Sequence, residues 1–362
     1  MALAPCKKPG SRRRQPTFLL SIRIMLLFLS TSADCKSMIG INYGRVADNL
    51  PSPTQVVTLI QQLKIGRVKI YDADPQVLTA LANTGLQVVV MVKNQEVEGV
   101  GSSEATADDW VQKNVLAWHP AVNIITVAVG NEILSDFTIQ RIWPRLVPAI
   151  KNIHSALNRY KRLSHVKVTT ALSIDCLEIS YPPSNGTFRN DIATPVIALL
   201  LQFLTETKAP FFINVYPYFA WASNPQQISL NYALFVSDTV VVEDGSLGYT
   251  NMLDAQLDAL LAAMARLGFE KVKLWISETG WPTKGDADEL GASIPNAALY
   301  NNRLVNWALG DTKGTPRLPG EAIPTFIFAL FNENLKPGPS TERNWGLLYP
   351  NGTFVYAFDL TI

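Results

Sequence analysis

Cysteine and histidine are scarce in this sequence, with three of each among 362 residues. His119, His154 and His165 lie in separate helical or loop segments, and neither an HExxH motif nor a paired Cys/His spacing is present. We therefore expect no metal site. A GxSxG motif is also missing, which removes the usual support for Ser-His-Asp hydrolysis. Three cysteines give no readable disulfide framework, and a chain of this length can bury a large core without one.

The sequence has no excess of charge of one sign, with 31 basic and 30 acidic residues and a formal net charge of +1. Six of the basic residues fall within residues 1–33, which contain no acidic residue. The rest of the chain therefore carries 25 basic and 30 acidic side chains, a net charge of −5. A mildly acidic body argues against nucleic acid or anionic lipid as a partner.

No apolar run is long enough to span a bilayer comfortably. The longest, FLLSIRIMLLFLS at residues 18–30, is split by Arg23, follows a basic stretch and precedes small residues up to Ala33. This order is typical of a secretory signal. We predict that residues 1–37 are such a signal, with cleavage near 33–37, and that residues 38–362 form one secreted domain of the cell wall. A retained membrane anchor and an organelle transit peptide are the alternatives.

The C-terminus, FVYAFDLTI, lacks the polar spacer and long apolar tail of a glycosylphosphatidylinositol signal, so we expect no such anchor. Two glycosylation sequons begin at Asn185 and Asn351 and contain turn residues, which suits a surface position. Both features are in keeping with a secreted glycoprotein.

Short apolar, β-branched runs alternate with longer segments of helical spacing along the whole chain. Near-continuous apolar runs are typical of parallel strands covered on both faces. Segments such as SPTQVVTLIQQL and NMLDAQLDALLAAMARLG have helical spacing and suitable starts, and the second ends at Gly268. The eight candidate strands begin at Ile39, Arg67, Gln87, Ile125, Val166, Phe211, Lys273 and Thr325.

Eight strands alternating with helices are compatible with a doubly wound sheet or an eightfold barrel. A Rossmann sheet requires a glycine-rich phosphate turn after its first strand, and this chain has none. Polar and aromatic residues, including Tyr71, Asn131 and Tyr216, stand at the strand ends instead, as on the catalytic rim of a barrel. We therefore predict a single-domain α/β fold, the (β/α)8 TIM barrel.

Two glutamates close apolar runs that are far apart in the sequence. Glu132 ends ITVAVGNE, at the fourth candidate strand, and Glu278 lies within KLWISETGWP, at the seventh. A single glutamate at a strand end is usually a surface group, but two at the same rim of one barrel suggest a catalytic pair. Paired carboxylates in a cleft are the working groups of glycoside hydrolysis. Asn131 supplies a neighbouring amide for a sugar hydroxyl or a carboxylate.

Five ordered segments make a resemblance to a known family specific. IGINYGRVADNLPSP, VAVGNEIL, INVYPYFAW, LWISETGWPTKGD and FALFNENLKPGPSTERNWGLLYPNGT resemble segments of plant glycoside hydrolase family 17, the β-1,3-glucanases. The resemblance runs from about Ile39 to the C-terminus. It implies a (β/α)8 barrel, no cofactor, Glu132 as the general acid/base and Glu278 as the nucleophile.

The resemblance to retaining glycosidases implies that the two carboxyl groups lie roughly 5–5.5 Å apart. Glu132 then needs a raised pKa, which the charge of Glu278 would supply, and Lys336 is a candidate for keeping Glu278 ionised. Glu333 and Glu342 match charged residues of the same family motif and would give electrostatic or hydrogen-bonding support.

Several aromatic side chains are candidates for lining a sugar-binding groove. The alternative for each is a position in the core. Trp281 has a flat face that suits a pyranose ring, and internal packing is an equal alternative for it. Tyr216 and Tyr218 are two residues apart in a candidate strand, so we expect them to point to the same side. The full set is Tyr71, Tyr216, Tyr218, Phe219, Trp281 and Phe331.

The sequence leaves the exact activity open among several functions. The leading prediction is a monomeric, retaining endo-β-1,3-glucanase acting on callose or laminarin-type wall glucan. Mixed-linkage β-1,3-1,4-glucan hydrolysis and transglycosylation would use the same chemistry. A catalytically silent wall protein that binds β-glucan is an alternative of another class, although a pure binder has no use for two opposed carboxylates.

Overall fold

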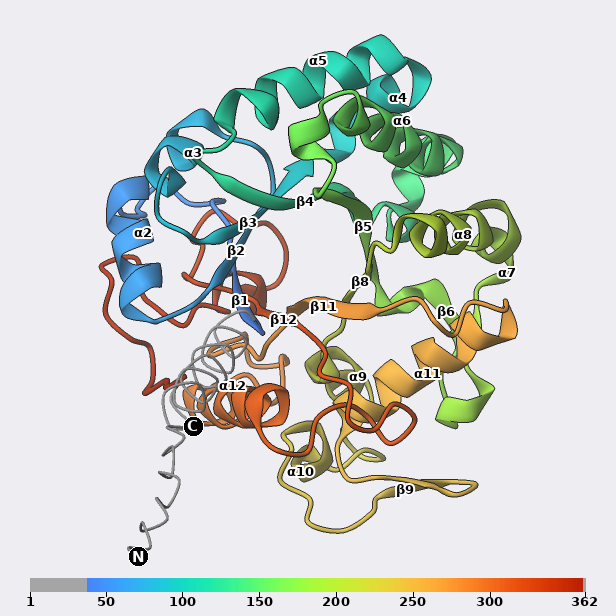
Figure 1. Ribbon diagram of the computed structural model, residues 1–362. Coiled ribbons are helices and arrows are strands. Elements are labelled where there is room, and N and C mark those ends of the chain that lie inside the picture. Colours follow the sequence, from blue (N-terminus) through green and yellow to red (C-terminus); the bar gives the residue numbers. More distant parts are fainter. Residues whose placement is uncertain (1–37, 361–362) are drawn as a thin grey trace, which may run out of the picture.

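A computed structural model describes residues 38–360 of the chain. Eight parallel strands form a closed barrel in the order β1-β12-β11-β8-β5-β4-β3-β2, and the helices surround it (Figure 1). The predicted (β/α)8 barrel is confirmed. The predicted signal, residues 1–37, lies outside the described residues.

All eight predicted strands are barrel strands. They are β1 (Ile39–Tyr43), β2 (Arg67–Ile70), β3 (Gln87–Val92), β4 (Asn123–Asn131), β5 (Lys167–Ser173), β8 (Phe211–Asn214), β11 (Leu274–Thr279) and β12 (Thr325–Ile327). Two short antiparallel pairs lie outside the barrel, β6 (Leu177–Ile179) with β7 (Thr187–Phe188) and β9 (Val242–Asp244) with β10 (Leu247–Tyr249).

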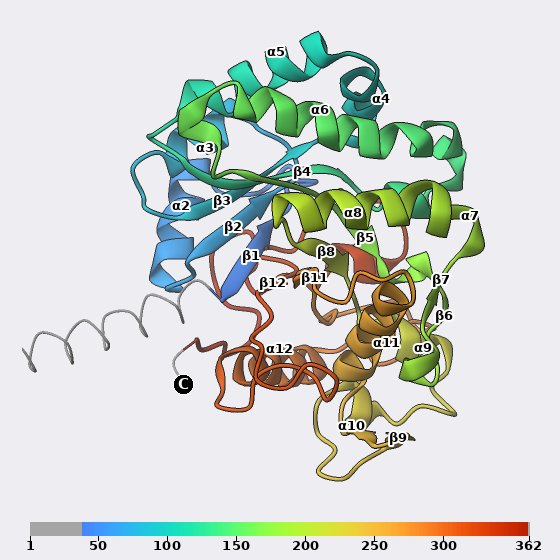
Figure 2. The same ribbon diagram turned by 45° about the vertical axis from the view of Figure 1, so that its right-hand side comes forward.

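The helices cover the outside of the barrel, as the turned view also shows (Figure 2). They are α2 (Pro53–Gln62), α3 (Pro75–Leu81), α4 (Asn94–Ser102), α5 (Glu104–Asn114), α6 (Leu146–Asn158), α7 (Asn190–Ile192), α8 (Ala198–Thr207), α9 (Pro217–Ser223), α10 (Leu230–Ala233), α11 (Met252–Arg266) and α12 (Ile294–Leu309).

Local sequence signals explain several helix ends. Ser52 and Gln55 form a capping box at the start of α2, where Pro53 occupies the first turn. The side chain of Asn251 caps α11 by accepting the Asp254 N–H. Gly268, the predicted stop of that helix, has φ +85°, a conformation that glycine adopts without strain.

The core has two parts because successive side chains of a strand face opposite sides. Val88, Val90 and Val92 of β3 belong to the large cluster between strands and helices. Val89 and Met91 of the same strand belong to a small separate cluster that fills the barrel interior, together with Ala128, Ala171, Phe212 and Phe326. The filled interior leaves the strand ends as the place where a site can form.

Candidate active site

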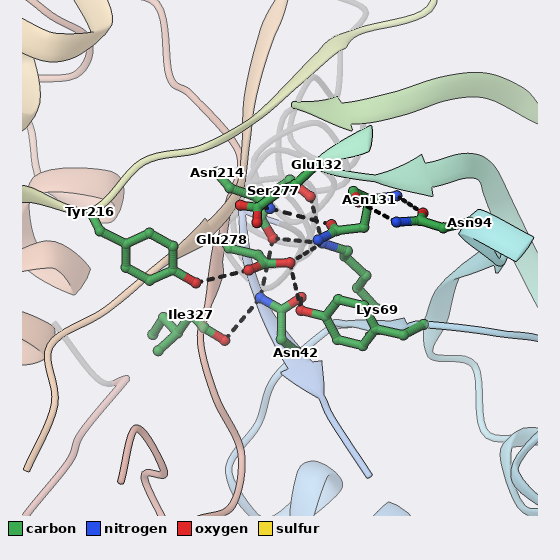
Figure 3. A network of polar contacts seen from close by, with 11 residues as sticks. Asn42, Lys69, Asn94, Asn131, Glu132, Asn214, Tyr216, Ser277, Glu278 and Ile327 are labelled. Atoms are coloured by element: carbon green, nitrogen blue, oxygen red, sulfur yellow. Dashed lines mark hydrogen bonds and ion pairs between the residues drawn. The ribbon is translucent and has the colours of Figure 1, made fainter. Parts of the chain in front are cut away.

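Glu278 lies near the end of β11 with three hydrogen-bond donors on its carboxylate. Lys69 Nζ donates to Oε1 at 2.8 Å and the Tyr71 hydroxyl to the same oxygen at 2.7 Å. The Tyr216 hydroxyl reaches Oε2 at 2.8 Å from the other side (Figure 3). Burial raises the pKa of Glu278, but the charge of Lys69 and the three hydrogen bonds outweigh it and hold this pKa below its usual 4.5. The group is therefore a carboxylate over most of the pH range.

Lys69 itself is completely buried, which is rare for a lysine. Its ammonium also donates to the Ser277 hydroxyl at 2.7 Å and lies 4.8 Å from the ring centre of Tyr71. Burial lowers the pKa of Lys69, and the ion pair with Glu278 opposes that shift. The pair is one unit, since removal of either partner would leave an uncompensated charge in the protein interior.

Glu132 follows β4 in a left-handed backbone conformation, with φ 53°. Its N–H donates to the Ala171 carbonyl at 2.8 Å, and its Oε1 accepts the Asn214 amide at 2.9 Å. Burial raises the pKa of Glu132 to about 7, and the negative charge of Glu278 adds to the shift. Near neutral pH this group therefore exchanges a proton while Glu278 stays ionised.

An irregularity at the end of β4 positions Glu132. The pairing of β4 with β5 shifts register between Ala128 and Asn131, and Gly130 has φ +72°. The Asn94 side chain bonds both backbone groups of Asn131, donating to its carbonyl at 2.9 Å and accepting its N–H at 2.8 Å. These contacts fix the backbone where it leaves the strand, so the following carboxyl group has a defined direction (Figure 3).

Both glutamates line one cavity of about 510 Å³ at the strand ends. Tyr216, Phe219 and Trp345 give it apolar walls, and Lys336 adds a charge. Two carboxyl groups whose surroundings push their pKa values apart are suited to one acid/base and one nucleophilic role. A cavity that combines aromatic walls with polar and charged groups is also suited to a ligand with both apolar faces and hydroxyl groups.

The family model for glycosyl hydrolases family 17 matches residues 39–360. The chain belongs to this family. It is 47% identical over 333 residues to the probable glucan endo-1,3-beta-glucosidase A6 of Arabidopsis thaliana, covering 91% of this chain and 69% of that protein. It is 40% identical to glucan endo-1,3-beta-glucosidase 11 of the same plant, covering 95% and 80%.

Solved structures agree with this assignment. A beta-1,3-glucanase and allergen of Cryptomeria japonica pollen is 41% identical and superposes with a TM-score of 0.85, over 90% of this chain and 99% of that one. A chain from a study of two plant beta-glucan endohydrolases with distinct substrate specificities is also 41% identical, with a TM-score of 0.82 over 88% and 99%.

Several of the site residues predicted from the sequence meet at the site. Tyr71 and Tyr216 bind Glu278, and the Asn131 Oδ1 accepts the Asn214 amide at 3.3 Å beside Glu132. Lys336 and Glu342 line the cavity as an ion pair of 3.0 Å, and Phe219 lines it as well. Glu333 is buried beside the site, where its Oε1 accepts the Val46 N–H at 2.8 Å and burial raises its pKa.

Three predicted groove residues are buried in the core instead. Trp281 is 0% exposed and donates from its ring nitrogen to the Gly291 carbonyl, so its face is not available to a sugar. Tyr218 packs edge-on against Trp281, and Phe331 packs against Tyr43. The expected shared strand parity of Tyr216 and Tyr218 is also wrong, because β8 ends at Asn214 and α9 begins at Pro217.

The partner suggested for Glu278 was also wrong. Lys69, and not Lys336, forms its ion pair, while Lys336 pairs with Glu342. The sequence carried a signal for Lys69, since it stands two residues before Tyr71 in the candidate strand RVKIYD, a spacing that predicts the same side. A lone lysine in RVKIYD is easily read as a surface residue. Asn214 and Trp345 were missed, although Asn214 lies within INVYPYFAW and Trp345 within the last of the five family segments.

Within residues 38–360, no group of three or more His, Cys, Asp or Glu side chains is placed to hold a metal ion. None of the helices in the same range has the length and apolar character needed to cross a membrane.

Proposed function

We propose that this protein is a retaining endo-β-1,3-glucanase that cleaves internal bonds of cell-wall glucan of the callose or laminarin type. The observation that carries the proposal is one cavity lined by two carboxyl groups, Glu278 held ionised and Glu132 with a pKa of about 7. The linkage is supported by relatives and neighbours whose names specify β-1,3-glucan.

In the first step, Glu278 attacks the anomeric carbon while protonated Glu132 gives its proton to the departing glycosidic oxygen. The carbon–oxygen bond of the substrate breaks and a glucosyl ester of Glu278 forms. Lys69, Tyr71 and Tyr216 fix the orientation of the nucleophile. Loss of the Glu278 charge in the ester lowers the pKa of Glu132, because the negative charge that helped to raise this pKa is gone.

In the second step, Glu132, now ionised, takes a proton from water, whose oxygen attacks the same anomeric carbon and releases Glu278. Two inversions leave the original β configuration. This scheme predicts a carboxyl separation of roughly 5–5.5 Å, the range in which one sugar carbon fits between the two groups.

The activity is tested by a reducing-sugar assay on linear β-1,3-, β-1,4- and mixed-linkage glucans. We expect release from the β-1,3-glucan with products of intermediate length. Preference for mixed-linkage glucan would reassign the substrate, and longer products made from added oligosaccharide would indicate transglycosylation. Binding to β-1,3-glucan without any cleavage would identify a silent binding protein.

The stereochemistry gives a second measurement. Proton NMR of a fresh digest should show the β anomer of each new reducing end before mutarotation adds the α form. Prompt appearance of the α anomer would exclude the double displacement, whatever the linkage.

The pKa values predict a bell-shaped dependence of kcat/KM on pH. The acid must be protonated, so activity falls as pH rises through about 7, the pKa of Glu132. The nucleophile must be ionised, so activity falls on the acid side below the ordinary carboxyl pKa of 4.5, because the pKa of Glu278 is lowered. Rates on a soluble glucan across this range check both limbs. An alkaline limb unmoved by substitution of Glu132 would contradict the assignment.

We further propose that residues 1–37 are removed on secretion and that the remaining chain acts as a monomer in the wall. Asn185 and Asn351 are both exposed, as a glycosylated asparagine must be. The N-terminal sequence, the native mass and the mass lost on removing N-glycans from the secreted protein test these points. A mature protein that still begins at Met1 would contradict the proposal that residues 1–37 are a cleaved signal.

A further inference from the structure

A second cavity of about 510 Å³ lies away from the active site. Its wall includes Asp254 of α11 and Arg303, Asn306 and Trp307 of α12, and it shares no lining residue with the catalytic cavity. Gln256, two residues beyond Asp254, lines the catalytic cavity instead. Positions two apart on a helix point about 200° from each other, so the two cavities lie on opposite sides of the start of α11.

Two aromatic rings form part of this wall. Trp307 and Phe235 are partly exposed, and their ring centres are 6.5 Å apart. Trp307 donates its ring N–H to Asp254 Oδ1 at 2.9 Å, which fixes the ring plane. Phe235 has φ 59°, a left-handed conformation that is uncommon for a bulky residue and costs free energy. The surrounding structure therefore holds this ring in place at the cavity against a local backbone preference.

Some polar groups of the cavity wall have hydrogen-bond partners within the protein, and others are free to bind a ligand. Asn251 and Asp254 are buried and bond to each other, with Asn251 Nδ2 donating to Asp254 Oδ2 at 2.6 Å. The exposed Asn306 side-chain amide has no hydrogen-bond partner within residues 38–360. Arg303 donates one guanidinium N–H to the Phe235 carbonyl at 3.0 Å. Free amide and guanidinium N–H groups beside fixed aromatic faces suit a ligand with apolar faces and many hydroxyl groups.

We propose that this cavity is a second carbohydrate site, which binds a short stretch of uncharged β-glucan through Phe235, Trp307, Asn306 and Arg303. The proposal rests on the proposed function, since it names the same polysaccharide. A glucan chain or particle held here keeps the catalytic cavity near other chains, and two linked sites raise the effective concentration of substrate. The second site should therefore raise the rate of hydrolysis of insoluble glucan and not that of short soluble oligosaccharides.

The test uses the full chain carrying Glu278→Gln, so that bound glucan is not consumed. Laminarihexaose binding is measured by calorimetry and by NMR in this chain and in versions that also carry Phe235→Gly or Asn306→Ala. Glycine suits the positive φ at 235, and Asn306 is exposed on a helix, so both variants should fold. Lys208→Gly is the matched control, because this exposed lysine also has a positive φ, 52°, and lies outside both cavities.

We expect two binding sites in the parent and in the Lys208→Gly control. Phe235→Gly should weaken the second site about five- to tenfold, as loss of one aromatic contact does, and Asn306→Ala should weaken it less. With Glu278 restored, both variants should hydrolyse soluble oligosaccharides at the parent rate and insoluble glucan more slowly.

A single site that neither variant changes would overturn the proposal, as would binding of oligogalacturonate or inorganic phosphate in preference to laminarihexaose. These results are independent of whether the parent enzyme hydrolyses soluble β-1,3-glucan. Failure of that hydrolysis would instead reject the proposed function.

Discussion

Replacement of Glu278 by glutamine should lower the rate of β-1,3-glucan hydrolysis by at least about a thousandfold, because an amide cannot attack the anomeric carbon. The amide oxygen can still accept from Lys69 and Tyr71, but the buried Lys69 loses its counter-charge, so the free energy of unfolding should fall as well. The same change removes the charge that raises the pKa of Glu132, which should then fall below about 7. Initial rates on a linear glucan and NMR titration of Glu132 measure the two effects.

The matched control is Glu342→Gln, which alters another glutamate of the same cavity. Glu342 pairs with Lys336 and has no contact with Glu278, so we expect its loss to cost less than about tenfold. Near-normal activity of Glu278→Gln, with circular dichroism unchanged, would remove Glu278 from the nucleophilic role. Equal losses in both variants would show that the cavity needs charge in general and not one nucleophile.

Replacement of Lys69 by methionine should have the second largest effect, and on two properties at once. It leaves the Glu278 carboxylate buried without its counter-charge, so the free energy of unfolding should drop by about 3–5 kcal/mol at neutral pH. The pKa of Glu278 should rise for the same reason, because burial is no longer opposed by a positive charge. The acid limb of the kcat/KM profile then moves to higher pH, which a purely structural role would not produce.

The sign of the stability effect follows from the shift. In the natural chain the lowered pKa of Glu278 stabilises the fold above the unfolded pKa of a glutamate and loses this contribution as pH falls through the folded pKa. In Lys69→Met the folded pKa is raised, so the protein should gain stability as pH falls. Thermal unfolding of both chains between about pH 4 and 8 measures whether the pH dependence of stability changes sign in Lys69→Met.

Two further variants make the Lys69 prediction specific. Lys336→Met removes the lysine that the sequence suggested as the partner of Glu278, and it should leave the acid limb in place because Lys336 pairs with Glu342. The double variant Lys69→Met/Glu278→Gln removes both charges and should regain most of the lost stability without activity. If the acid limb moved in Lys336→Met and not in Lys69→Met, the assignment of Lys69 as the partner of Glu278 would be wrong.

The sequence was most informative where a local pattern has one structural meaning. The short apolar runs from Ile39 to Thr325 are barrel strands, as expected for strands that are covered on both faces and alternate with longer helical segments. Glu132 and Glu278 followed from their places at the ends of two such runs. Because parallel barrel strands end at one rim, the two strand ends predict that the pair lies on the same side of the barrel.

Side-chain environment was less predictable, because it depends on segments distant in the chain. Trp281 stands only three residues after Glu278, yet its ring packs against Trp221 of α9 and Tyr300 of α12. Tyr216 reaches Glu278 while Tyr218 turns into the core, because β8 stops before both of them. No periodicity marks where a barrel strand gives way to its loop.

The amino-acid sequence by itself determined the alternation of strands and helices, the barrel and the two glutamates, since hydrophobic periodicity and strand ends are local properties of the chain. Only the tertiary structure decided which cation meets Glu278 and which aromatic rings stay accessible. Those choices follow from burial and electrostatic contacts between residues more than 200 positions apart, such as Lys69 and Glu278, and such contacts exist only once the barrel has closed.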